Sequence, residues 1–181
     1  MRSLRVFAFI LSIAALPFLV GCKTTGAATD TPALRAERAT LAKFIGAWDF
    51  EGWYEPVDAP RRTSKGKAAG VLEHSHFVLL DTQSTVTEDG KSRELRGSIL
   101  FSVAPGEGLQ LSAWSDNSPA LRQFKGSIKN NGNLFAFKGI PAPGNSNQVR
   151  LDILFSSADR WTAEFTRGSK VIASYTFIRA K

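Results

Sequence analysis

The sequence predicts an all-β fold, an antiparallel up-and-down β-barrel of eight to ten strands preceded by one short helix. Two observations lead to this prediction. From residue 46 onward, apolar and polar residues alternate with the period of two that is typical of strands with one buried face. Turn sequences separate these runs about every ten residues. They include Asp89-Gly90 and Asn131-Gly132, whose residues tolerate the positive φ of tight hairpins.

The chain begins with the layout of a secretory signal. Two arginines precede an apolar run over residues 6–20, and residues 19–22 read Leu-Val-Gly-Cys. This ending resembles the lipobox of bacterial lipoproteins, which implies cleavage before Cys22 and attachment of lipid to its thiol. The alternative is a membrane-spanning helix, but the run is shorter than the roughly 20 apolar residues that a span needs. We therefore expect residues 1–21 to be a lipoprotein signal peptide.

Residues 22–31 are expected to form a lipidated cysteine followed by a flexible tether, because the residues after Cys22 are small and polar. Cys22 is the only cysteine, so the fold has no intramolecular disulfide. Position 23 is Lys, whereas Asp there implies retention at the inner membrane in enterobacterial lipoproteins. We expect the protein to be lipid-anchored in the bacterial cell envelope, at the outer membrane and facing the periplasm.

The predicted barrel domain covers residues 32–181 and begins with a helix. Thr31-Pro32 is a typical helix start, because threonine caps the first turn and proline fits the first helical position. Leu34 and Leu41 recur at about helical spacing before a glycine ends the segment. We predict one short helix over residues 32–44, packed on the domain by one face.

The strands after the helix each have one apolar face. Closing such a sheet into a barrel protects its edges, and a sandwich with the same strand count is the alternative. The faces that we expect to be buried in five of the runs are Trp48, Phe50, Gly52 and Tyr54; Leu95, Gly97, Ile99, Phe101 and Val103; Val149, Leu151, Ile153 and Phe155; Trp161, Ala163 and Phe165; and Val171, Ala173, Tyr175, Phe177 and Arg179.

Two elements at the ends of the domain point to a known family. Gly46-Ala47-Trp48 opens the first strand, and Arg179 lies near the end of the last one. The pair resembles the Gly-x-Trp opening of lipocalin and calycin barrels and the basic residue that packs across its tryptophan. The stretch from Leu109 to Gly139 is similar to a calycin-like family of uncharacterised bacterial proteins. The resemblance covers about residues 44–181 and implies a closed barrel with a cation–π contact between Arg179 and Trp48.

Thirteen Phe and four Trp give the barrel a large aromatic content. A barrel of this size either fills its interior with side chains or encloses one small ligand, and the sequence leaves both open. For an acidic group on a ligand, Arg179 and Arg150 are the candidate partners. The residues that we expect to bind the ligand are Trp48, Phe50, Tyr54, Phe101, Phe137, Tyr175, Phe177 and Arg179.

We therefore expect a membrane-anchored lipoprotein whose barrel binds a small hydrophobic ligand. The alternative is a non-enzymatic structural or interaction lipoprotein with a side-chain-filled barrel, in which Trp53 or Trp114 contacts an envelope protein. An enzyme acting on envelope lipid or glycan is the weakest hypothesis, because no Gly-x-Ser-x-Gly elbow is present. Carboxylates that could pair in space are Glu51, Asp81, Asp116, Asp152 and Glu164, and most lie on the polar face of their strands.

No cofactor, metal, catalytic residue or nucleic acid is expected. His74 and His76 are the only histidines, and on a strand residues at this spacing would point to one side, but no third ligand follows at diagnostic spacing. Nitrobindins, which are among the calycin-like proteins that this sequence resembles, hold haem through a histidine late in the chain, and this sequence has no histidine after His76. The formal net charge is +7, but the basic residues are scattered and form no nucleic-acid patch.

Overall fold

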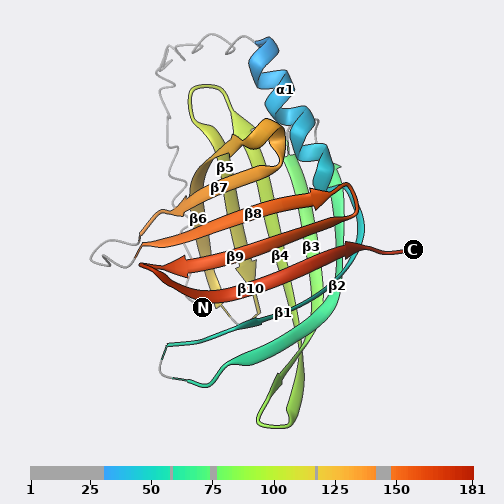
Figure 1. The fold of residues 1–181 in the computed structure, drawn as a ribbon, viewed down its shortest axis with the longest axis vertical. Helices are drawn as coiled ribbons and strands as arrows, with labels where there is room; N and C mark the ends of the chain where they lie inside the picture. Colours follow the sequence, from blue (N-terminus) through green and yellow to red (C-terminus); the bar gives the residue numbers. More distant parts are fainter. Residues whose placement is uncertain (1–30, 58, 74–76, 117, 142–147) are drawn as a thin grey trace, which may run out of the picture.

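The computed structural model describes residues 31–57, 59–73, 77–116, 118–141 and 148–181. The expected signal peptide, most of the tether including Cys22, and both histidines lie outside the described residues. The described chain forms a closed antiparallel barrel in which each strand pairs with its neighbours in sequence and the first strand pairs with the last (Figure 1). The predicted up-and-down barrel is confirmed at ten strands, and the sandwich alternative is wrong.

One α-helix and a short 3₁₀ turn precede the barrel, and another 3₁₀ turn interrupts it. The elements are α1 (Pro32–Leu41), η1 (Ala42–Phe44), β1 (Gly46–Tyr54), β2 (Arg62–Glu73), β3 (Phe77–Glu88), β4 (Lys91–Ala104), β5 (Gly108–Ser115), β6 (Ser118–Lys129), η2 (Asn130–Gly132), β7 (Leu134–Gly139), β8 (Val149–Ser157), β9 (Arg160–Arg167) and β10 (Lys170–Arg179).

The helix forms where the sequence predicts it. The Thr31 side chain accepts a hydrogen bond from the Leu34 amide at 3.2 Å, which caps the first turn. Leu34 and Leu41 are buried, and α1 packs beside β3 and β4 at one end of the barrel (Figure 1). The last three residues of the predicted helix tighten into η1, which places Phe44 in the core.

The alternation of the strands sets which side chains enter the barrel. Burial confirms the predicted inward faces of β8 and β9, and it confirms Phe101 and Val103 on β4 and Trp48 and Phe50 on β1. The other predicted residues of β4, Leu95, Gly97 and Ile99, are half-buried and line the cavity. The expected face of β10 is wrong at Val171. A bulge between Val171 and Ala173 shifts the register, so Val171 pairs with outward-facing Thr166 while Ile172 lines the interior.

The hairpins follow the predicted turn residues. Between β3 and β4, Asp89 and Gly90 have φ values of 49° and 74°, which suit a two-residue turn with the twist of the flanking strands. Between β6 and β7, Asn131 and Gly132 also have positive φ, at 52° and 82°. Short turns of this kind keep consecutive strands adjacent and leave no crossover in the barrel.

Candidate ligand-binding cavity

One end of the barrel is filled by aromatic side chains, and we call it the closed end. Phe44, supplied by η1, is fully buried there and stacks on Phe101 with ring centroids 4.2 Å apart. Phe135, Phe155 and Trp161 make edge contacts with the same ring, at centroid distances of 5.0, 5.1 and 5.4 Å. This cluster leaves no room for a ligand at the closed end.

Trp48 and Arg179 hold the closed end together. Trp48 is fully buried, and its indole N–H donates to the Phe44 carbonyl at 3.0 Å. The Arg179 guanidinium lies 4.3 Å from the Trp48 ring, which confirms the expected cation–π contact. Arg179 also donates to the Ile45 carbonyl at 3.1 Å and to the Asp159 carboxylate at 2.9 Å. These contacts join η1 and β1 to β10. The guanidinium N–H groups of Arg179 donate to groups of the protein itself.

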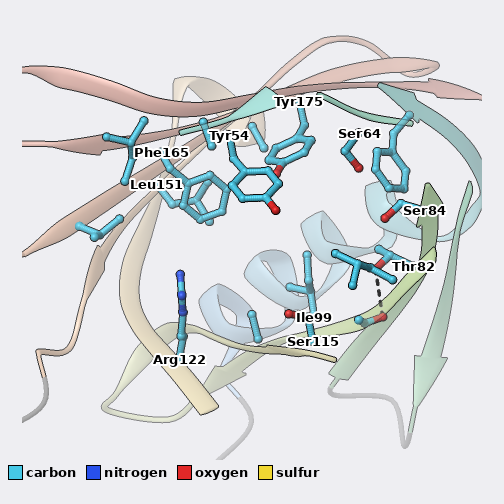
Figure 2. A pocket seen from close by; sticks show the side chains of 18 of the residues that line it. Tyr54, Ser64, Thr82, Ser84, Ile99, Ser115, Arg122, Leu151, Phe165 and Tyr175 are labelled. Atoms are coloured by element: carbon cyan, nitrogen blue, oxygen red, sulfur yellow. Dashed lines mark hydrogen bonds between the residues drawn. The ribbon is translucent and has the colours of Figure 1, made fainter. Parts of the chain in front are cut away.

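The opposite end, which we call the open end, contains a cavity of about 520 Å³ (Figure 2). Aromatic residues form one part of its wall, with the rings of Tyr54 and Tyr175 beside that of Phe165. Ser64 and Ser84 lie across from Phe165 and Leu151, as Figure 2 shows. The cavity is therefore largely apolar, with a few hydroxyl groups at defined positions.

The two tyrosines give the cavity hydrogen-bonding groups. Burial, together with the neighbouring Tyr54, raises the pKa of Tyr175 to about 12, so its phenol is protonated at neutral pH. The Tyr54 hydroxyl accepts a hydrogen bond from Arg62 at 3.4 Å. Arg62 in turn forms an ion pair with Glu88 at the open end. The phenol of Tyr175 can therefore donate a hydrogen bond toward a ligand.

The structure brings five of the eight predicted ligand residues to the cavity wall: Phe50, Tyr54, Phe101, Tyr175 and Phe177. The other three lie outside the lining. Trp48 and Arg179 belong to the closed end, and Phe137 is fully buried beside Phe101, with ring centroids 6.3 Å apart. Strand alternation tells which face a residue occupies but not how far along the barrel it lies, and depth separates these three from the cavity.

Arg150, Trp53 and Trp114, three further residues predicted to make contacts, lie outside the cavity or at its edge. Arg150, the other candidate for an acidic ligand group, pairs instead with Asp152 at 2.8 Å, and its side chain is exposed. Trp53 has the Arg61 guanidinium 3.8 Å from its ring centre. Trp114 is 43% exposed and lies at the edge of the cavity.

Sequence reasoning missed several polar lining residues. Arg122 on β6 and Arg167 on β9 line the cavity, as do Ser64, Thr82 and Ser84. The alternation of the strands could have revealed Arg122 and Arg167. Each arginine lies two residues from an inward-facing phenylalanine and therefore occupies an inward position. A charged residue at such a position marks a mouth or a site rather than a core.

Glu55 is the only carboxylate among the described residues that line the cavity. Among the described residues, no three His, Cys, Asp or Glu side chains gather where they could hold a metal ion. The carboxylates of Glu51, Asp81 and Glu164 are on exposed residues of the outer surface. In the part of the chain that the structure describes, no helix has the length and apolar content needed to cross a membrane.

Comparison with known proteins shows the fold and not a family. No protein-family model matches the chain, and no curated protein matches it significantly. Rv2717c from M. tuberculosis has a similar structure, with a TM-score of 0.56 and 12% identity over 83% of this chain and 99% of that one. The S-type phycobiliprotein lyase CPES from Guillardia theta is also similar, with a TM-score of 0.50 and 11% identity over 82% of this chain and 97% of the lyase. A designed fluorescence-activating β-barrel has a TM-score of 0.45 and 12% identity, over 76% of this chain and 94% of the designed one.

These likenesses establish a ten-stranded antiparallel barrel with structural neighbours among solved proteins. At 11–12% identity they extend no further than the fold. Membership of the lipocalin and calycin group and the bacterial lipoprotein assignment stay predictions from the sequence.

Proposed function

We propose that this protein is a membrane-anchored bacterial lipoprotein whose barrel binds a small hydrophobic ligand. The observation that carries the proposal is the cavity at the open end. Its volume of about 520 Å³ lies within the range of roughly 300–1,000 Å³ that is usual for small-molecule sites. Its wall combines aromatic rings with a few polar groups, which is the lining that such sites have.

The filled closed end supports the same proposal. A barrel plugged by Phe44 at one end and hollow at the other is a pocket with one opening. The alternative of a barrel filled throughout by side chains disagrees with this cavity. Trp53, offered by that alternative as a docking residue, is covered on one ring face by Arg61. An envelope protein partner stays a prediction.

Membrane anchoring in the proposal is supported by the sequence around Cys22. A diacylglycerol on the thiol, with a further acyl chain on the new N-terminus, supplies the multiple chains that stable anchoring requires. The small polar residues that follow Cys22 would separate the barrel from the lipid surface. The proposed location is the bacterial outer membrane, with the barrel in the periplasm.

Blocking the cavity tests the proposed function. Ala113 lines the cavity, so Ala113→Phe would place a ring in the ligand space. We expect the full chain to bind the neutral apolar fluorophore Nile red saturably, and Ala113→Phe to weaken binding by about tenfold or more, corresponding to about 1.4 kcal/mol. Fluorescence titration measures both affinities.

The matched control is Ala69→Phe, which adds the same ring at an exposed position on the outer wall of β2. The control is expected to bind Nile red as the unchanged protein does. Thermal unfolding of both variants checks that they fold. Saturable binding that Ala113→Phe leaves intact would contradict the assignment of the cavity as the ligand site.

A further inference from the structure

The open end carries positive charge at inward positions. Phe124 on β6 and Phe165 on β9 face each other inside the barrel, with ring centroids 6.5 Å apart. Two residues nearer the open end on the same strands, and on the same inward face, are Arg122 and Arg167. Both line the cavity, and Figure 2 shows the Arg122 side chain extending into it.

Arg167 has an incompletely satisfied guanidinium. Its Nε is buried and has no hydrogen-bond partner among the described residues. No carboxylate in the described part of the chain forms an ion pair with it. A partly buried cation without a partner is costly, and a bound anion would remove that cost.

Two acidic residues near the open end, Glu55 and Glu88, are already paired with other cations. Glu55, the only carboxylate among the described cavity-lining residues, forms a salt bridge with Lys170 at 2.6 Å. The hydrogen bond from Lys170 lowers the pKa of Glu55, so this carboxylate is ionised at neutral pH. Glu88 is paired with Arg62. Neither carboxylate therefore neutralises Arg167, which lines the cavity.

We propose that the ligand is an anionic amphiphile, with its apolar chain along the aromatic wall and its acidic head group at Arg167 and Arg122. This inference rests on the proposed function and names the ligand class of the same cavity. A guanidinium binds carboxylate and phosphate oxygens in the same two-pronged geometry, so either head group has the required chemistry. It differs from the sequence prediction, which offered Arg179 and Arg150 for the acidic group.

Matched ligands separate the head group from the chain. Calorimetric titration of the full chain at neutral pH, below the micellar concentration, would compare dodecanol, dodecanoate and dodecyl phosphate. We expect at least one anion to bind about tenfold or more tightly than the alcohol, as charge-assisted hydrogen bonds predict. The tighter of the two anions identifies carboxylate or phosphate as the head group.

Substitution of Arg167 tests whether this residue binds the acidic head group. Arg167→Gln is expected to reduce the preference for the anion to about threefold or less, with dodecanol binding retained. The control Arg160→Gln makes the same charge change at an exposed outward position at the other end of β9, and it is expected to keep the full preference. If Arg167→Gln does not fold by circular dichroism, Arg122→Gln is the second variant and is expected to reduce the preference in the same way.

The possible failures are distinguishable. Equal binding of dodecanol and both anions would overturn the anionic head group and leave the hydrophobic cavity standing. A preference that Arg167→Gln and Arg122→Gln both retain would overturn the assignment of these arginines. Absence of binding by all three ligands would overturn this inference together with the proposed function.

Discussion

The substitution Phe44→Ala tests whether η1 closes one end of the barrel. Phe44 is fully buried, stacks on Phe101 at 4.2 Å and meets three further aromatic rings at their edges. Truncating a buried phenylalanine costs about 3–5 kcal/mol, because transfer free energy is lost and a cavity remains. The dense ring contacts place this site toward the upper part of that range. For a domain of this size, the loss corresponds to a fall of about 10–20 °C in Tm.

Urea and thermal unfolding followed by circular dichroism would measure the change. The matched control is Phe77→Ala, because Phe77 is 36% exposed at the start of β3 and its removal leaves no enclosed space. We expect the control to lose less than about 1.5 kcal/mol. Equal losses in the two variants would refute the conclusion that Phe44 is a core element of the closed end.

Two further predictions concern Arg179 and Tyr175. Arg179→Met removes the cation–π contact with Trp48 and hydrogen bonds to backbone carbonyls, so we expect a loss of about 1–3 kcal/mol by urea unfolding. Arg150→Met, on the outer wall, is the control and should change stability by less than about 0.5 kcal/mol; similar losses would contradict the closed-end role. Because burial raises the pKa of Tyr175 to about 12, the unfolded chain loses its phenolic proton first, near pH 10. The free energy of unfolding should therefore fall as pH rises from about 10 to about 12, and Tyr175→Phe should remove part of that slope; parallel curves for the two proteins would contradict the buried phenol.

Most of the fold could be predicted because local rules determine it. Alternation fixes which residues of each strand face inward, and Asp89-Gly90 requires a tight turn between β3 and β4. The resemblance to lipocalin and calycin barrels implied the contact between Trp48 and Arg179, and in the structure these two residues are paired in register where the last strand meets the first. The bulge near Ile172 left no pattern in the sequence, because one extra residue interrupts the alternation only once.

The cavity could be predicted only in part. Whether an aromatic ring fills the barrel or lines a space depends on Phe44, which reaches the core from outside the strand pattern. Phe101 touches that ring and also borders the cavity, whereas Phe137 lies outside the lining. The free donors of Arg167 depend on which carboxylates lie near it in space, and spacing along the chain does not contain that information.

Native mass spectrometry would test the ligand-binding barrel on the full chain, extracted from a bacterial envelope fraction with a mild non-ionic detergent that is removed in the gas phase. We expect an extra mass that leaves on denaturation, in contrast to a lipid on Cys22, which would remain attached. Fragmentation of the released species should identify an acidic amphiphile. A mass equal to that of the protein alone, unchanged after incubation with dodecanoate or dodecanol, would contradict the ligand-binding barrel.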